Sequence, residues 1–234
     1  MRSSGPSFSV FLDANVLAKP LTRTLLMLAG GASGYGTTWS EYVEVEANRN
    51  LRPRQRSVTE VRELAGQELS EAGEISGRFT ATAMEDRQVL ADAAKAGALF
   101  IVTEDVDDFD VTDLKAYGIA AVNPDLFLAS CSSEAGYLDA LEFIAALSRN
   151  PRLTPEELHV RLGRAHPHTV QAHRLAFSGI PMRATHRPPA VLYRGDRCLK
   201  CLQVVNSVAS RGVCQKCGQT AENPTESTNP PPYG

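Results

Sequence analysis

Residues 8–17 read FSVFLDANVL, and this stretch decides the fold. Its first five residues form an apolar, β-favouring run that stops at Asp13, which predicts a short buried strand with a carboxylate at its C-terminal end. Residues 98–105, ALFIVTED, repeat the arrangement, with a predicted strand over residues 98–103 followed by Glu104 and Asp105. Because parallel strands bring their C-terminal ends to one edge of a sheet, Asp13 and Asp105 are expected to meet there.

Helical patterns separate these two strands from two others. Strands are also predicted around residues 37–39 and over residues 118–122, and helices over residues 21–29, 40–51, 58–72 and 86–96. Gly30 and Gly31 are expected to close the first of these helices, and Ser40 is expected to cap the second. Strands that alternate with helices indicate an α/β domain with a parallel sheet flanked by helices.

Two further acids are expected at the same edge of the sheet. The helical periodicity places Glu46 on an inward, apolar stripe and Glu44 on the opposite side. On the next acidic helix it turns Asp86 toward the core and Asp92 toward solvent. Four clustered carboxylates repel one another unless a cation lies among them, and oxygen ligands favour Mg²⁺ or Mn²⁺. Each acid taken alone also has a structural explanation, in a turn, at a helix start or in a loop.

The order and context of these acids resemble those of the PIN-domain nucleases, and among them the VapC-type toxins of bacterial toxin–antitoxin modules. The resemblance covers roughly residues 8–130 and rests on FLDANVL at 11–17, WSE at 39–41, RNL at 49–51, DRQVLA at 86–91, IVTED at 101–105, and Asp108-Phe109. It implies four metal-binding acids and two supporting polar residues, namely Asp13, Glu46, Asp86 and Asp105 with Asn15 and Thr103. Either Asp105 or Asp108 is the fourth ligand, because many relatives have Asn at the first position and an acid at the second.

The chain continues for about a hundred residues beyond this domain. Helices predicted over residues 134–148 and after the capping box that begins at Thr154 form a helical extension over residues 131–180. A proline-containing linker over residues 181–192 leads to a cysteine-containing module at 193–220, and the tail at 221–234 is expected to be disordered. Four histidines of the extension match no metal-binding spacing and are interpreted as surface or packing residues: His159, His166, His168 and His173.

Two Cys-x-x-Cys pairs are the most specific local motif in the chain. Cys198 and Cys201 form the first pair, and Cys214 and Cys217 follow after twelve intervening residues. Four thiolates at this spacing predict a zinc ribbon, in which Zn²⁺ has a closed tetrahedral coordination sphere and a structural role. The fifth cysteine, Cys131, is interpreted as a small core or surface residue. Paired cysteines, with no apparent secretory leader or membrane span, favour a cytoplasmic protein.

The charge is distributed unevenly along the chain. Residues 1–150 contain 13 Lys and Arg against 22 Asp and Glu, a net charge of −9, whereas residues 151–218 contain 11 against 3, a net charge of +8. A basic half indicates a polyanionic partner, here RNA. The residues predicted to contact RNA phosphates lie after the Glu46 helix and in the ribbon: Arg49, Arg52, Arg194, Arg197 and Lys200.

These features together predict a metal-dependent endoribonuclease that hydrolyses RNA phosphodiester bonds, with Mg²⁺ or Mn²⁺ as catalytic ion and Zn²⁺ as structural ion. The resemblance adds a cognate antitoxin protein and a homodimer as expected partners, and no membrane partner is expected. The alternative is a catalytically inactive PIN and zinc-ribbon adaptor that binds RNA or protein. The complete set of acids favours the enzyme, because an adaptor has no use for clustered carboxylates.

Overall fold

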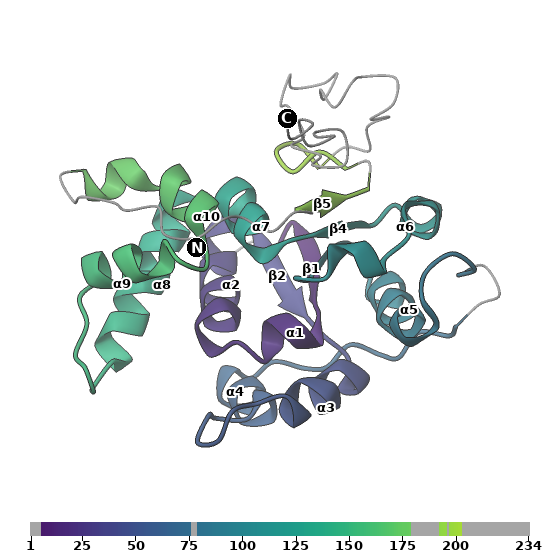
Figure 1. Ribbon diagram of the computed structural model, residues 1–234, viewed down its shortest axis with the longest axis horizontal. Coiled ribbons are helices and arrows are strands. Elements are labelled where there is room, and N and C mark those ends of the chain that lie inside the picture. The colour runs from purple at the N-terminus through teal and green to yellow at the C-terminus, as the bar shows by residue number, and fades with distance from the viewer. Residues whose placement is uncertain (1–5, 76–78, 179–191, 196, 203–234) are drawn as a thin grey trace, which may run out of the picture.

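The computed structural model describes residues 6–75, 79–178, 192–195 and 197–202. A five-stranded sheet lies at its centre, with helices on both faces (Figure 1). The elements in chain order are β1 (Phe8–Leu12), α1 (Ala14–Leu17), α2 (Pro20–Ser33), β2 (Tyr35–Thr38), α3 (Glu41–Arg49), α4 (Val58–Ala65), η1 (Met84–Asp86), α5 (Arg87–Lys95), β3 (Ala98–Val102), η2 (Val106–Asp108), α6 (Val111–Tyr117), β4 (Ala120–Val122), α7 (Pro124–Cys131), α8 (Glu134–Leu147), α9 (Pro155–Leu162), α10 (Pro167–Ala172), η3 (Arg174–Phe177) and β5 (Tyr193–Arg194).

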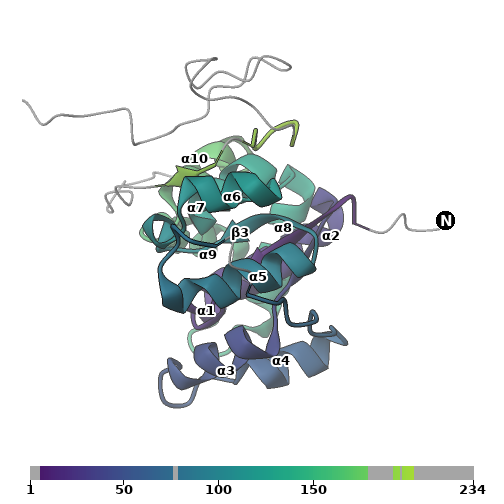
Figure 2. The same ribbon diagram turned by 90° about the vertical axis from the view of Figure 1, so that its right-hand side faces the viewer.

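The strand order in the sheet is β2-β1-β3-β4-β5, in which the first four strands are parallel and β5 is antiparallel to β4. The register aligns Leu12 of β1 with Val102 of β3, and Val102 with Val122 of β4. All three side chains are fully buried, as expected for parallel strands that are covered on both faces. Helices α2 and α7 lie on one face, and α5 and α6 on the other (Figures 1 and 2). The predicted α/β class with a mostly parallel sheet is therefore confirmed.

Strands β1, β3 and β4 end at the same edge of the sheet. The backbone N–H of Asp13 donates to the carbonyl of Val102 over 3.1 Å, and the N–H of Thr103 donates to the carbonyl of Val122 over 3.0 Å. The parallel ladder thus continues one residue beyond each strand. It holds Asp13 and Thr103 in fixed positions next to each other.

Two predicted helix ends were wrong. Helix α2 continues through Gly30, because this glycine provides close packing and does not terminate the helix: a Cβ there would lie 2.6 Å from the carbonyl oxygen of Tyr35. The helix ends at Gly34, whose φ of 81° is in the left-handed region. Helix α4 likewise ends before Gly66, with φ 62°, and not at residue 72. The caps at Ser40 and Thr154 are confirmed.

The helical extension packs directly on the sheet domain. Helix α8 lies along α2, and their backbones approach so closely at Gly136 that a Cβ would lie 2.6 Å from the carbonyl oxygen of Ala29. Behind this contact, the hydroxyl of buried Tyr137 lies 2.9 Å from Nδ1 of His159, and its ring stacks on His173 at 4.3 Å. These two histidines are therefore packing residues of the helical extension.

The chain returns to the sheet after the extension. Tyr193 and Arg194 pair with β4, and the N–H of Asn123 donates to the carbonyl of Leu192 over 2.7 Å. The sequence had placed residue 193 at the start of a separate ribbon, whereas the structure makes it part of the central sheet. The linker at 181–191, the tail at 221–234 and the second cysteine pair lie outside the described residues. Within the described part of the chain, no helix is long and apolar enough to cross a membrane.

Candidate metal centre

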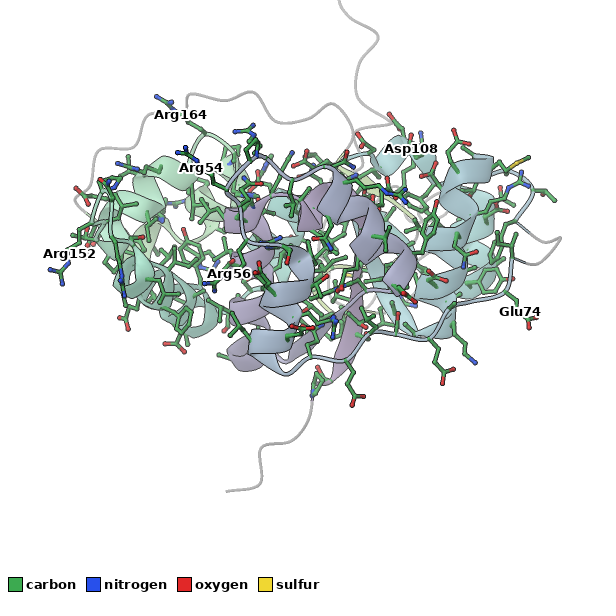
Figure 3. All side chains as sticks on the ribbon, turned by 90° about the horizontal axis from the view of Figure 1, so that it is seen from below. Arg54, Arg56, Glu74, Asp108, Arg152 and Arg164 are labelled. Carbon is green, nitrogen blue, oxygen red and sulfur yellow. The ribbon has the colours of Figure 1, made fainter. Side chains whose placement is uncertain are left out.

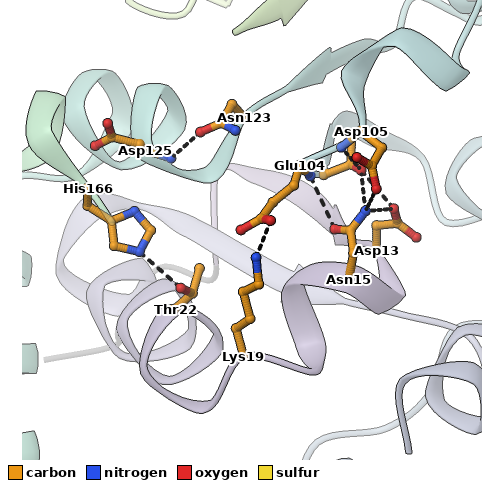
Figure 4. A network of polar contacts seen from close by, with 10 residues as sticks. Asp13, Asn15, Lys19, Thr22, Glu104, Asp105, Asn123, Asp125 and His166 are labelled. Carbon is orange, nitrogen blue, oxygen red and sulfur yellow. Dashed lines mark hydrogen bonds and ion pairs between the residues drawn. The ribbon is translucent and has the colours of Figure 1, made fainter. Parts of the chain in front are cut away.

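Four polar residues at the C-terminal ends of β1 and β3 form one hydrogen-bonded network (Figure 4). This Asp13 network consists of Asp13, Asn15, Thr103 and Asp105. The amide Nδ2 of Asn15 lies 2.9 Å from Oδ2 of Asp13, 2.9 Å from Oγ1 of Thr103 and 3.1 Å from Oδ2 of Asp105. The hydroxyl of Thr103 donates to the same Asp13 oxygen over 2.7 Å. The structure thus brings together four residues that the sequence places about ninety positions apart.

Local backbone structure sets the orientation of this network. Asp13 is the N-cap of α1, and its Oδ1 accepts from the N–H of Ala14 over 2.7 Å. Asn15 is fixed from its other side, because its Oδ1 accepts the N–H of Glu104 over 3.1 Å. Thr103 is fully buried and also accepts the N–H of Asp105 over 3.1 Å. Asn15 and Thr103 therefore position the two carboxylates.

The environment of Asp13 penalises its negative charge. Burial raises the pKa of Asp13 to about 6, and the nearby charges of Glu46 and Asp105 add to the increase. Hydrogen bonds from Thr103 and Ala14 act in the opposite direction but do not cancel it. A carboxylate that is supplied with donors and still titrates near neutral pH is a candidate functional group.

A second acidic group, formed by Glu46, Asp86 and Asp108, borders the Asp13 network. Asp86 ends η1 and precedes α5. Burial, the charge of Asp108 and then that of Asp13 raise the pKa of Asp86 to about 7, with further contributions from Glu85 and Glu46. Burial and the charge of Asp105 also raise the pKa of Asp108. Both candidates for the fourth acid are thus close to the site, Asp105 within the Asp13 network and Asp108 beside Asp86.

The predicted orientation of two helices needs correction. Glu46 is exposed, whereas Glu44, which was expected to point outward, is only 5% exposed. Glu44 is buried because Trp39 Nε1, Thr59 Oγ1 and Arg62 Nε donate to it over 2.9, 2.7 and 2.9 Å. Burial alone would raise its pKa, but these hydrogen bonds and the Arg62 charge lower it. The indole N–H of a buried Trp39, which needs an acceptor, is the sequence feature that could have indicated this.

Asp92 is the second acid whose predicted orientation was wrong. It was expected on the solvent face of α5 but is fully buried, because the segment around Gly73 packs against the helix backbone at Ala91 and Asp92. The N–H of Gly73 and Nε2 of Gln88 donate to its Oδ1 over 2.7 and 2.6 Å. A segment without regular secondary structure gives no periodic pattern, so this burial could not be seen in the sequence.

Sequence reasoning also missed two residues beside the network. Lys19, at the start of α2, forms an ion pair with Glu104 (Figure 4). Tyr42 lies on α3 one turn before Glu46, and burial and then the charges of Glu46, Asp86, Asp92 and Asp13 raise its pKa. Tyr42 is 46% exposed.

The donor set of this edge consists of carboxylate, hydroxyl and amide oxygens, which fits Mg²⁺ or Mn²⁺ and not a thiophilic metal. Two of the acids have pKa values raised to about 6 and about 7, as expected where a compensating cation would be bound. Among the described residues, however, no three acidic, histidine or cysteine side chains are already arranged as a finished metal site.

Only half of the predicted zinc ligands can be described. Cys198 is buried and Cys201 is half-buried, and the N–H of Leu202 donates to the carbonyl of Cys198 over 2.8 Å, which bends the chain between them. Cys214 and Cys217 lie outside the described residues. The half-buried thiol of Cys131 lies 3.4 Å from the carbonyl oxygen of Leu199, so it packs against this turn.

The residues predicted to contact RNA differ in availability. Arg49, Arg52 and Lys200 are exposed. Arg194 forms an ion pair with Asp107 over 2.6 Å, and the guanidinium of half-buried Arg197 donates to the carbonyl oxygens of Gly118 and Leu202. Burial lowers the pKa of Arg197, as expected for a cation used internally. The expectation of a free surface at Arg197 is therefore corrected.

Four exposed arginines lie on the opposite side of the molecule from Asp108. Figure 3 shows Arg54, Arg56, Arg152 and Arg164 on the side of the helical extension, and Asp108 on the opposite side. Arg54 and Arg56 belong to the loop between α3 and α4, which starts one residue after Arg49.

Comparison of the chain with protein-family models, with curated proteins and with solved structures gives no match.

Proposed function

We propose that the protein is a metal-dependent endoribonuclease with a PIN-type fold. One observation supports this most strongly: carboxylates from four separate segments lie near the C-terminal edge of a parallel sheet, and the pKa of Asp13 and that of Asp86 are raised to about 6 and about 7. Acids with a purely structural role would be expected to have their negative charge compensated by hydrogen-bond donors, as Glu44 is by Trp39, Thr59 and Arg62. The C-terminal edge of the strands is also where open α/β sheets bind their ligands.

In this proposal Asp13, Asp86 and either Asp105 or Asp108 hold Mg²⁺ or Mn²⁺, and Glu46 completes the set. A bound divalent ion would supply a Lewis acid for the phosphodiester and lower the pKa of a coordinated water. Asn15 bridges Asp13 and Asp105 by donating to an oxygen of each, and Thr103 holds Asp13 from the buried side. Because Asp86 titrates near neutrality, metal binding would release a proton from it.

The remaining parts of the proposal concern the partners. RNA is held by exposed arginines, including Arg49 and Arg52, and by Lys200. Cys198 and Cys201 bind a structural Zn²⁺ together with Cys214 and Cys217. The same PIN-type proposal includes binding of the chain by a neutralising antitoxin protein and formation of a homodimer.

The test is cleavage of RNA by the purified full chain in Mn²⁺ and in EDTA, with the ends of the fragments mapped. The Asp13→Asn variant is expected to lose cleavage, whereas Asp139→Asn, at an exposed acid of α8, should retain it. Cleavage that resists EDTA, or that survives Asp13→Asn, would contradict the proposal. RNA binding by the wild-type chain with no cleavage in any divalent metal would favour the inactive adaptor.

A further inference from the structure

Tyr42 has an exposed aromatic ring beside the acids. Helix α3 contributes Val43 and Ala47 to the core, both fully buried, whereas Tyr42 is 46% exposed. Residues four apart lie on the same side of a helix, so the Tyr42 ring is next to Glu46. Because α3 packs against both α1 and α5, Tyr42 also lies near Asp13 and Asp86, which cap these two helices and whose charges act on its hydroxyl.

The fold does not require an aromatic side chain at this position. The described contacts of Tyr42 include no ring stacking and no hydrogen bond, although other aromatic residues of the described chain, such as Tyr35 and Phe127, pack edge to face. The hydroxyl of Tyr42 is neutral near pH 7, because the ordinary pKa of tyrosine is about 10 and burial, followed by the charges of nearby acids, raises the pKa of Tyr42 further. The side chain therefore presents a neutral, flat surface beside a strongly acidic group of residues.

We infer that Tyr42 stacks on an unpaired base of the RNA, next to the phosphate that is held at the acids. This inference rests on the proposed function. Nucleotide bases stack readily on tyrosine rings in single-strand binding sites. In an A-form duplex the bases are already stacked and paired, so a ring beside the phosphate-binding acids has no free base to contact.

Three substitutions of Tyr42 distinguish the contribution of its ring from that of its hydroxyl. Tyr42→Phe keeps the ring, Tyr42→Trp enlarges it, and Tyr42→Ala removes it. Phe143→Ala is the matched control, because Phe143 is an aromatic residue with 50% exposure on α8, in the helical extension. Since Tyr42 and Phe143 are both largely exposed, all four variants should unfold at a temperature close to that of the wild-type chain.

Cleavage rates would be measured on a single-stranded oligoribonucleotide, on the same strand in a duplex, and on a strand that lacks one base next to the mapped cleavage site. Tyr42→Ala is expected to raise KM for the single strand about tenfold with little change in kcat. Tyr42→Phe, Tyr42→Trp and Phe143→Ala should behave like the wild-type enzyme. On the abasic strand, Tyr42→Ala should have no further effect, because its stacking partner is already missing.

Binding of a labelled oligouridylate of about 12 nucleotides to the same variants, by fluorescence anisotropy, makes the test independent of activity. Tyr42-dependent binding without cleavage would refute the nuclease proposal but retain the stacking role. Cleavage that Tyr42→Ala leaves unchanged would overturn the inference alone. It would also be overturned if Tyr42→Phe were as defective as Tyr42→Ala, if the Tyr42→Ala defect persisted on the abasic strand, or if duplex RNA were cleaved equally well.

Discussion

Replacing Asp13 with Asn tests whether the acids are held in a mutually repulsive state without metal. The pKa of Asp13 rises from 3.8 to about 6 in the folded protein. At about 1.4 kcal/mol per pKa unit, ionisation of Asp13 therefore lowers the free energy of unfolding by up to about 3 kcal/mol near pH 7.5. Asn removes that cost but presents an N–H₂ group where Asp13 accepts hydrogen bonds from Ala14, Asn15 and Thr103, which loses about 1 to 2 kcal/mol.

The net expectation is a gain of about 1 to 2 kcal/mol for Asp13→Asn at pH 7.5 in EDTA. Because the folded-state pKa is above the unfolded value, the wild-type protein loses stability from this group as pH rises from about 4 to about 6. At pH 4.5 the carboxyl of the folded protein is largely protonated and its cost falls to about 1 kcal/mol, so the variant should be less stable than the wild type by up to about 1 kcal/mol.

Urea unfolding at the two pH values measures this reversal, with Asp139→Asn, at an exposed acid, as the control. Saturating Mn²⁺ should then stabilise the wild-type protein much more than Asp13→Asn. If the free energies of unfolding of the wild type and Asp13→Asn differed by the same amount at pH 4.5 and pH 7.5, the electrostatic reasoning would be refuted, whatever the effect on cleavage.

Three other predictions address the remainder of the chain. Zinc should copurify at about one ion per chain and be lost in Cys201→Ser; metal analysis that finds none would contradict the ribbon. Gly136→Ala should lower stability by about 1 to 2 kcal/mol in thermal unfolding, because its Cβ would lie 2.6 Å from Ala29 O, whereas Gly31→Ala, with open space around it, should not. Arg197→Ala should lower stability but leave the salt dependence of RNA binding unchanged. Lys200→Ala should reduce the slope of log affinity against log salt concentration by about one. The reverse pattern would show that Arg197, and not Lys200, contacts an RNA phosphate.

The sheet and the Asp13 network were largely predictable because their signals are local. Short apolar runs that end at Asp13 and at Thr103-Glu104-Asp105 define both the strands and the edge at which they meet. The topology rule for parallel sheets then brings the two ends together without any knowledge of side-chain packing.

The side-chain orientations were less predictable because they depend on which surfaces of each helix are covered. On α3, Glu44 and Glu46 differ by two positions, and only the burial of Trp39 and Arg62 around Glu44 decides between them. Gly30 and Gly34 are both glycines near one helix end, but the approach of Tyr35 makes the first a packing residue. The internal role of Arg197 depends on the return of the chain to β4, for which the sequence has no periodic signal.

The return of Tyr193 and Arg194 to β4 also protects the sheet from self-association. Without them, the outer side of β4 would be an open edge with unpaired backbone groups, which is a template for pairing with another molecule. A shortened chain that stopped at residue 178 would expose this edge and also the apolar side of Ala121 and Val122, both fully buried in the complete protein. The sheet is therefore completed by a segment that follows the helical extension, and we expect fragments that end before residue 192 to aggregate more than the complete chain during expression.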